Sequence, residues 1–246
     1  MIRIYNDPEK LCQTAAMTFF EQVSHSISER GRFSVVLAGG ETPRRLYEVL
    51  ATPPFQERIC WGDVHVFWSD ERCVPPDDPR SNARMARQAL LNHVPIPPEN
   101  IHPIHCETSP QQAALSYEQE LRDFFGSQPP IFDLVLLGLG ENGHTASLFP
   151  HTPVLKEQQH WVAEVYVAEL DMYRVTLTAP LINQARQVVF LVCGSEKASV
   201  LQNVLEGAYQ PNDLPAQLIR PNGAQPIWLV DKAASRKLAV ENEEPI

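Results

Sequence analysis

The sequence predicts an α/β fold, a single-domain, Rossmann-like architecture with a mostly parallel sheet and helices on both faces. Runs of β-branched and aliphatic residues alternate with helical patterns along the 246-residue chain, and this alternation is typical of parallel sheets. The segment 132–140, FDLVLLGLG, is almost continuously apolar, as expected of a strand that is covered on both faces. No repeat or linker interrupts the pattern, which favours one domain over residues 1–246.

The first half begins with a strand in FSVVLAGG (33–40), followed by a helix in TPRRLYEVLA. Thr42 is the expected N-cap of that helix and Pro43 its first residue, because hydroxyl side chains favour the cap and proline the first turn. A second strand is expected in VHVFWSD (64–70), and a helix in SNARMARQALLNHV follows it, capped by Ser81 or Asn82.

Another amphipathic helix is expected in QQAALSYEQELRDFF, with Leu115, Leu121 and Phe125 on or near its apolar face. The second half contains further patterned segments, and two of them have the order strand, glycine or aspartate, then helix. These segments are HWVAEVYV, YRVTLTAPLINQA, QVVFLVCGSEKASVLQNVLEG and QPIWLVDKAAS.

Four expected strand ends contain residues suited to ligand binding. They are Gly39–Thr42, Ser69–Arg72, Gly138–His144 and Gly194–Lys197. Ligands of open α/β sheets bind beyond the carboxyl ends of the strands. We therefore expect these four segments to meet at one site.

Composition excludes several functions and partners. The formal net charge of −10 disfavours general binding to nucleic acids or anionic membranes, which needs a basic face. The N-terminal segment lacks the apolar core of a signal peptide, and no apolar run is long enough to span a membrane. The five cysteines are scattered, without a C-x-x-C pair, so neither a disulfide framework nor a thiolate zinc site is indicated. A reduced, cytoplasmic protein is the simplest expectation.

The glycine loop before His144 allows two interpretations. Gly138, Gly140 and Gly143 have the spacing of a dinucleotide-binding turn, but such a turn should open the first βαβ unit, and this one lies past the middle of the chain. The other interpretation is a catalytic loop, because three glycines let the backbone approach a ligand and histidine suits proton transfer near neutral pH. His144 is expected at the start of a helix, and from the residues alone a packed or capping role is the more common one for such a histidine.

The remaining strand ends indicate an anion site. Gly39 and Gly40 permit a tight turn, and the helix after them offers free N–H groups to a phosphate. Arg72, Arg174 and Lys197 could together neutralise a phosphate and locally offset the acidic total. Each of these features is also compatible with an ordinary turn or surface cation. No required metal is expected, since the histidines show no recognised ligand spacing.

Several motifs in order resemble one family. LAGGETPRRLYEVL, WSDERCVPPDDPRSNARMA, LLGLGENGHTASLFP, YRVTLT, GSEKA and LPAQLIRPNG are similar to segments of 6-phosphogluconolactonases, in the family shared with glucosamine-6-phosphate isomerases. The resemblance covers roughly residues 30–235 and is most specific in GHTASLFP. It implies hydrolysis of 6-phospho-D-glucono-1,5-lactone to 6-phosphogluconate in the oxidative pentose phosphate pathway, with no cofactor, by a monomer or homodimer.

The resemblance also implies roles for single residues. His144 would be the base that activates water, Arg72 would orient or stabilise the substrate at its reacting end, and Asp70 would have an electrostatic role. Substrate and phosphate binding would fall to a larger set: Gly39, Gly40, Thr42, Ser81, Asn82, Arg174 and Lys197.

Two positions depart from the family pattern. Asn142 stands where aspartate is common, and an amide can orient His144 but cannot raise its basicity. Glu41 stands in the glycine turn where serine or threonine is common, so its carboxylate is expected to point away from a phosphate.

Three rival functions make different predictions. A sugar-phosphate isomerase or deaminase would use Asp70 as its base and turn over glucosamine 6-phosphate or a ketose phosphate. A sugar-phosphate sensor would bind without catalysis, but it would normally have a basic DNA-binding module, which this sequence lacks. A dehydrogenase would bind NAD(P).

Overall fold

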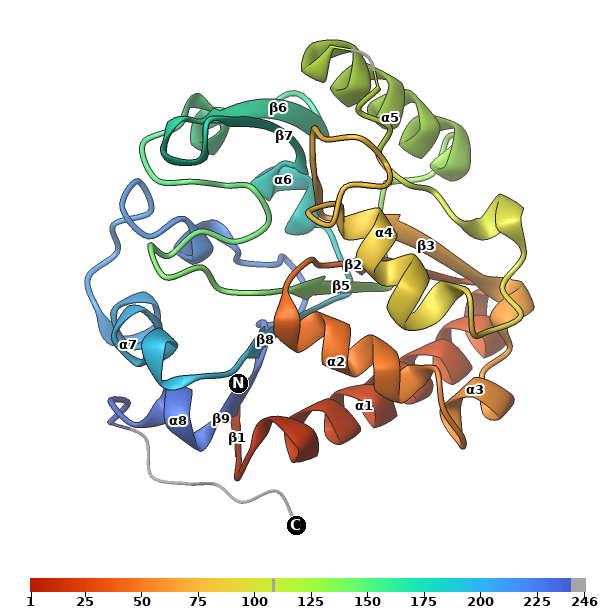
Figure 1. The fold of residues 1–246 in the computed structure, drawn as a ribbon, viewed down its shortest axis with the longest axis horizontal. Helices are drawn as coiled ribbons and strands as arrows, with labels where there is room; N and C mark the ends of the chain where they lie inside the picture. The colour runs from red at the N-terminus through yellow and green to blue at the C-terminus, as the bar shows by residue number, and fades with distance from the viewer. Residues whose placement is uncertain (108, 240–246) are drawn as a thin grey trace.

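The computed structural model describes residues 1–107 and 109–239 and contains a six-stranded parallel sheet at its centre (Figure 1). The strand order is β1-β9-β8-β5-β2-β3. These strands are β1 (Ile2–Tyr5), β2 (Phe33–Leu37), β3 (Val64–Trp68), β5 (Leu134–Leu137), β8 (Gln187–Val192) and β9 (Ile227–Asp231). Every residue of β2 and β5 is buried. Their near-continuous apolar sequences are therefore explained by burial on both faces.

Helices cover both faces of this sheet, so the predicted fold class is confirmed. Helices α1 and α2 run side by side below the parallel strands in Figure 1, and α5 lies above them. The helices are α1 (Pro8–Arg30), α2 (Glu41–Leu50), α3 (Phe55–Arg58), α4 (Asn82–Ala86), α5 (Pro110–Phe125), α6 (Ala179–Ile182), α7 (Ala198–Glu206) and α8 (Lys232–Ser235). None of the described helices is long and apolar enough to cross a membrane.

A second, antiparallel sheet of three strands lies beside the first and was not predicted from the sequence. Its order is β4-β7-β6, with β4 at Asp70–Arg72, β7 at Met172–Leu177 and β6 at Val162–Val167. Asp70 lies opposite Thr176, and Arg72 lies opposite Arg174. Because β4 has only three residues, its sequence contains no alternation that could reveal it.

One expected helix cap differs from the observed one, and another is confirmed. Helix α2 begins at Glu41, and its N-cap is Gly40, with φ of +103° and no side-chain capping bond. Thr42, the expected cap, therefore lies within the first turn. Ser81 is confirmed as the cap of α4, where its side chain accepts from Arg84 N.

The expected apolar face of α5 is wrong at one residue. Leu121 and Phe125 are buried, but Leu115 is 58% exposed. Leu115 and Leu121 are six residues apart, so at about 100° per residue their side chains point to different sides of the helix. Tyr117 and Ala114 complete the buried face instead.

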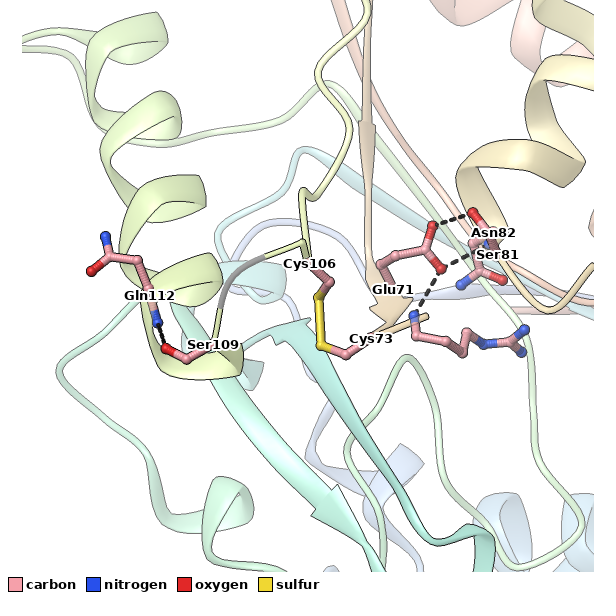
Figure 2. Close-up of a disulfide and its surroundings, with 8 residues drawn as sticks. Glu71, Cys73, Ser81, Asn82, Cys106, Ser109 and Gln112 are labelled. Carbon is pink, nitrogen blue, oxygen red and sulfur yellow. Dashed lines mark hydrogen bonds between the residues drawn. A yellow bond between two sulfur atoms is a disulfide. The ribbon is translucent and has the colours of Figure 1, made fainter. Parts of the chain in front are cut away.

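The expectation that no cysteines pair is also wrong. Cys73, directly after β4, forms a disulfide with Cys106, in the segment that leads to α5 (Figure 2). Their sequence separation is 33 residues and their Cα atoms lie 5.0 Å apart. A pairing this distant leaves no local motif, so only the folded chain reveals it.

Candidate active site

The candidate site is a cavity of about 780 Å³ at the carboxyl ends of the strands. All four predicted strand-end segments contribute to its lining, so their expected meeting at one place is confirmed. The order in which the chain adds strands reverses direction between β2 and β5. Strand β3 lies on one side of β2, whereas β5, β8 and β9 follow one another on its other side. The cavity therefore lies at the topological switch point, where α/β sheets bind ligands.

Most of the predicted site residues lie in this cavity wall. Those that line it are Gly39, Gly40, Thr42, Asp70, Arg72, His144, Arg174 and Lys197. Two predicted contacts, Ser81 and Asn82, do not belong to the lining formed by the described residues and are buried behind it.

Asn142 fixes the tautomer of His144. The Asn142 Oδ1 atom accepts from the backbone N–H of His144 at 3.3 Å and lies 2.5 Å from His144 Nδ1. Since this oxygen is an acceptor, Nδ1 must bear the proton, and Nε2 keeps its lone pair. No hydrogen bond to Nε2 is found among the described residues. The imidazole is therefore set up to accept a proton at Nε2.

The ring of His144 is packed between two neighbours. It stacks on Phe149 at a centroid distance of 4.0 Å and an interplanar angle of 19°. On another side, a Cβ atom at Gly140 would overlap the imidazole. The expected helix after His144 is absent, and the chain continues through turns with an isolated bridge between Thr145 and Leu148. The glycines therefore shape a loop that holds His144.

Burial keeps His144 neutral over a wide pH range. Desolvation lowers the pKa of His144 from 6.5 to about 4. The negative charge of Asp70 opposes this shift, whereas Arg174, Lys197 and Arg72 lower the pKa further. At neutral pH the imidazole is thus a free base, although a weaker one than an exposed histidine.

Asp70 is buried and held by several donors. Ser147 Oγ donates to its Oδ2 at 2.6 Å, and Asn82 Nδ2 lies 3.3 Å from its Oδ1. Arg174 Nη1 approaches Oδ2 at 3.5 Å, in a pair whose side chains are both more than nine-tenths buried. Asp70 thereby fixes the position of Arg174 at the cavity wall.

Glu71 organises the backbone behind the cavity. Its carboxylate accepts from the backbone N–H groups of Arg72, Asn82 and Ala83 and from Ser81 Oγ, at 2.7–3.0 Å. Figure 2 shows the last of these contacts beside the disulfide. Burial raises the pKa of Glu71 despite these hydrogen bonds. Ser81 and Asn82 therefore support Asp70 and Glu71 from behind the cavity.

Two arginines of the cavity lining each have a buried donor without a partner in the part of the chain that the structure describes. The Nε atoms of Arg72 and Arg174 are buried without a hydrogen-bond partner among the described residues. Arg72 Nη1 donates to Arg80 O at 2.5 Å, which fixes the guanidinium from its other end. A buried donor without a partner is costly, and the side chains that bear these two atoms belong to the cavity lining.

The glycine turn before α2 also lines the cavity. The first N–H groups of α2 have no side-chain cap, and the α2 N-terminus carries a partial positive charge. The Glu41 carboxylate pairs with Arg44 and Arg45, and Glu41 and Arg45 both belong to the cavity lining. That Glu41 points away from a phosphate therefore stays a prediction. Lys197 also lines the cavity, 3.8 Å from the exposed carboxylate of Glu141.

Sequence reasoning missed three residues of this site. Ser147 and Phe149 lie within the GHTASLFP motif, and their positions there were the available signal. Arg45, a cation in the cavity lining, follows the glycine turn by one helical turn. No group of three or more His, Cys, Asp or Glu side chains suited to a metal occurs within residues 1–107 and 109–239.

The fold and the site together define a Rossmann-like α/β protein with a histidine and several cations around a strand-end cavity. Comparison with known proteins agrees with this class. Residues 6–228 match the family model of glucosamine-6-phosphate isomerases/6-phosphogluconolactonase. The chain belongs to this family.

Individual relatives are similar over nearly their whole length. A 6-phosphogluconolactonase of Synechocystis sp. is 44% identical over 233 residues, which cover 93% of this chain and 94% of the relative. One of Haemophilus influenzae is 36% identical, with coverage of 89% and 90%. The solved structure of 6-phosphogluconolactonase from Trypanosoma cruzi is 29% identical and superposes with a TM-score of 0.87, covering 97% of each chain.

Proposed function

We propose that this protein is a 6-phosphogluconolactonase, which hydrolyses 6-phospho-D-glucono-1,5-lactone to 6-phosphogluconate in the oxidative pentose phosphate pathway. The observation that carries the proposal is His144, held in the cavity with Nδ1 on Asn142 and Nε2 free. The 44% identity to a 6-phosphogluconolactonase supports the choice of substrate. The cavity combines one base with cations, which suits a phosphorylated and already activated ester.

The first step is attack of water on the lactone carbonyl. His144 Nε2 accepts a proton from the water as its oxygen bonds to the carbonyl carbon, and the ring becomes an imidazolium. The negative charge that develops on the carbonyl oxygen is stabilised by the positive charge of the Arg72 guanidinium, which lines the cavity. Asp70 stabilises the imidazolium, since its charge favours protonation of His144.

The second step opens the ring. The carbonyl re-forms, the bond to the ring oxygen breaks, and the imidazolium returns its proton to that oxygen. The product acid then ionises, which releases one proton to solvent. The lowered pKa of His144 makes its imidazolium a strong acid, which favours this donation.

The glycine-turn end of the cavity is suited to the phosphate. The backbone N–H groups after Gly40, Thr42, Arg45 and Lys197 all border it. Arg174, which Asp70 holds at the cavity wall, adds a further positive charge for the substrate. Binding of the phosphate at one end thus presents the lactone carbonyl to His144 at the other.

The contacts of Asp70 argue against an isomerase or deaminase. Such an enzyme would need Asp70 to abstract a carbon-bound proton, but both of its oxygens already accept hydrogen bonds from buried side chains. We therefore expect no turnover of glucosamine 6-phosphate.

The test is hydrolysis of freshly generated 6-phosphogluconolactone above its spontaneous background. We expect wild type to accelerate the loss of lactone and His144→Ala to reduce kcat by about 10²–10⁴, the usual contribution of a general base. Asp133→Asn, at the opposite end of β5, is the matched control. Equal rates for wild type and His144→Ala would refute the role of His144, and no acceleration by wild type would refute the lactonase.

The broader setting follows from the same assignment. We propose that the chain acts as one lactonase domain over residues 1–246, in the cytoplasm, as a monomer or homodimer. Its net charge of −10 disfavours a nucleic-acid partner. No cofactor is required by the two steps above.

A further inference from the structure

We infer that Phe149 is a positioning residue for the base: its ring fixes the plane of His144 and shields the imidazole from water. The inference rests on the proposed function, in which His144 acts as the base. It gives Phe149 a role beyond filling the core.

Contacts on more than one side restrict the movement of the His144 imidazole. The Phe149 ring stacks on the imidazole with a centroid distance of 4.0 Å and an interplanar angle of 19°. Gly140 lies so close on another side that a Cβ atom there would overlap the imidazole. Asn142 fixes the Nδ1 edge. A histidine with only the Asn142 contact could still tilt about that hydrogen bond, so the stacked ring is needed to keep Nε2 directed at one point.

Phe149 also serves a second side chain of the site. Its own side chain is 5% exposed, and the Arg174 guanidinium carbon lies 5.1 Å from its ring centroid. One aromatic ring therefore contacts both the proposed base and a substrate-binding cation. Displacing it would disturb their relative position, on which the proposed reaction depends.

Shielding by the ring affects protonation as well as orientation. The charged groups that face His144 are Asp70 and Arg72 from β4, Arg174 from β7 and Lys197 from the turn before α7. All four remain when Phe149 is replaced. A smaller side chain would admit water to one face of the imidazole, and hydration favours its charged form. The pKa of His144 should therefore rise towards 6.5.

The test compares Phe149→Leu with Phe132→Leu. Phe132 is also a buried phenylalanine, but it precedes β5 and lies outside the cavity lining formed by the described residues. Both substitutions remove an aromatic ring from a packed interior, so a general loss of stability is matched. Phe149→Met, with a longer flexible side chain, provides a second variant at the same position.

Two measurements separate positioning from a merely structural role. In an NMR titration of the histidine rings, with the His144 signal assigned by its absence in His144→Gln, we expect the midpoint in Phe149→Leu to rise by about one pKa unit. We expect kcat for the lactone at pH 7 to fall about tenfold with KM nearly unchanged. Phe132→Leu should change neither.

An unchanged His144 midpoint and kcat in folded Phe149→Leu or Phe149→Met would overturn the inference. The NMR titration needs no turnover. If the His144 midpoint shifts in Phe149→Leu but wild type has no lactonase activity, the proposed function is refuted and the shielding of His144 stands. If wild type is active but the Phe149 variants keep its midpoint and kcat, the proposed function stands and the role of Phe149 is refuted.

Discussion

The disulfide between Cys73 and Cys106 should contribute several kcal/mol to the free energy of unfolding. It closes a loop of 33 residues. The chain-entropy relation for a loop of this length gives a loss of about 12.5 cal/mol/K in the unfolded chain, or about 3.7 kcal/mol at 25 °C. For a chain of this size, that difference corresponds to a fall in Tm of about 7–15 °C.

The assay is thermal unfolding of wild type and Cys106→Ala, followed by circular dichroism. Cys60→Ala is the matched control, because Cys60 is a free and exposed cysteine, and it should leave Tm unchanged. Titration of thiols in denaturant without reductant should find the three free cysteines of wild type, Cys12, Cys60 and Cys193. Five reactive thiols, or a Tm of Cys106→Ala equal to that of wild type, would refute the reasoning.

Four further results are expected. Asn142→Asp places a carboxylate against His144 Nδ1, so the acid limb of kcat/KM should move to higher pH by about 1–3 units; an unmoved limb contradicts this. Because the pKa of His144 is lowered to about 4, the unfolded chain binds a proton first as pH falls from about 6.5, and the free energy of unfolding should drop by about 3 kcal/mol before levelling near pH 4. Urea titrations should show no such component in His144→Gln. The Glu71 carboxylate accepts four hydrogen bonds, and Glu71→Gln replaces one of its oxygens with an NH₂ group that cannot accept. The substitution should lower the free energy of unfolding by about 2 kcal/mol and should also lower kcat. Asp133→Asn removes the charge of a buried carboxylate that pairs with two arginines. Urea unfolding should show a free energy of unfolding lower by about 2 kcal/mol, with kcat unchanged.

Most of the parallel framework could be predicted because its signals are local. Strand β5 is a continuous apolar run in the sequence. A glycine follows the last residue of β2, β5 and β8 within two positions, so each strand and its turn can be recognised from one short segment. Since parallel strands bring their carboxyl ends to one edge, the meeting of these segments followed from topology alone.

The rest depended on contacts between distant parts of the chain. Strand β4 becomes a strand only by pairing with β7, about a hundred residues later, and that pairing brings Arg174 to Asp70. The hydrogen bond from Ser147 to Asp70 joins residues 77 apart in the sequence. No pattern within a single segment encodes such contacts, so Ser81 and Asn82 were expected in the cavity rather than behind it.

The two sheets divide the cavity between them. The glycine turn and Lys197 follow strands of the parallel sheet, whereas Asp70, Arg72 and Arg174 belong to the antiparallel one. The proposed base, His144, follows β5 and so belongs to the parallel sheet together with the proposed phosphate site. In evolutionary terms, substitutions on β4 and β7 can alter the charged groups around the base without rebuilding that framework. Such a division of the cavity between two sheets is consistent with a family that includes both isomerases and lactonases.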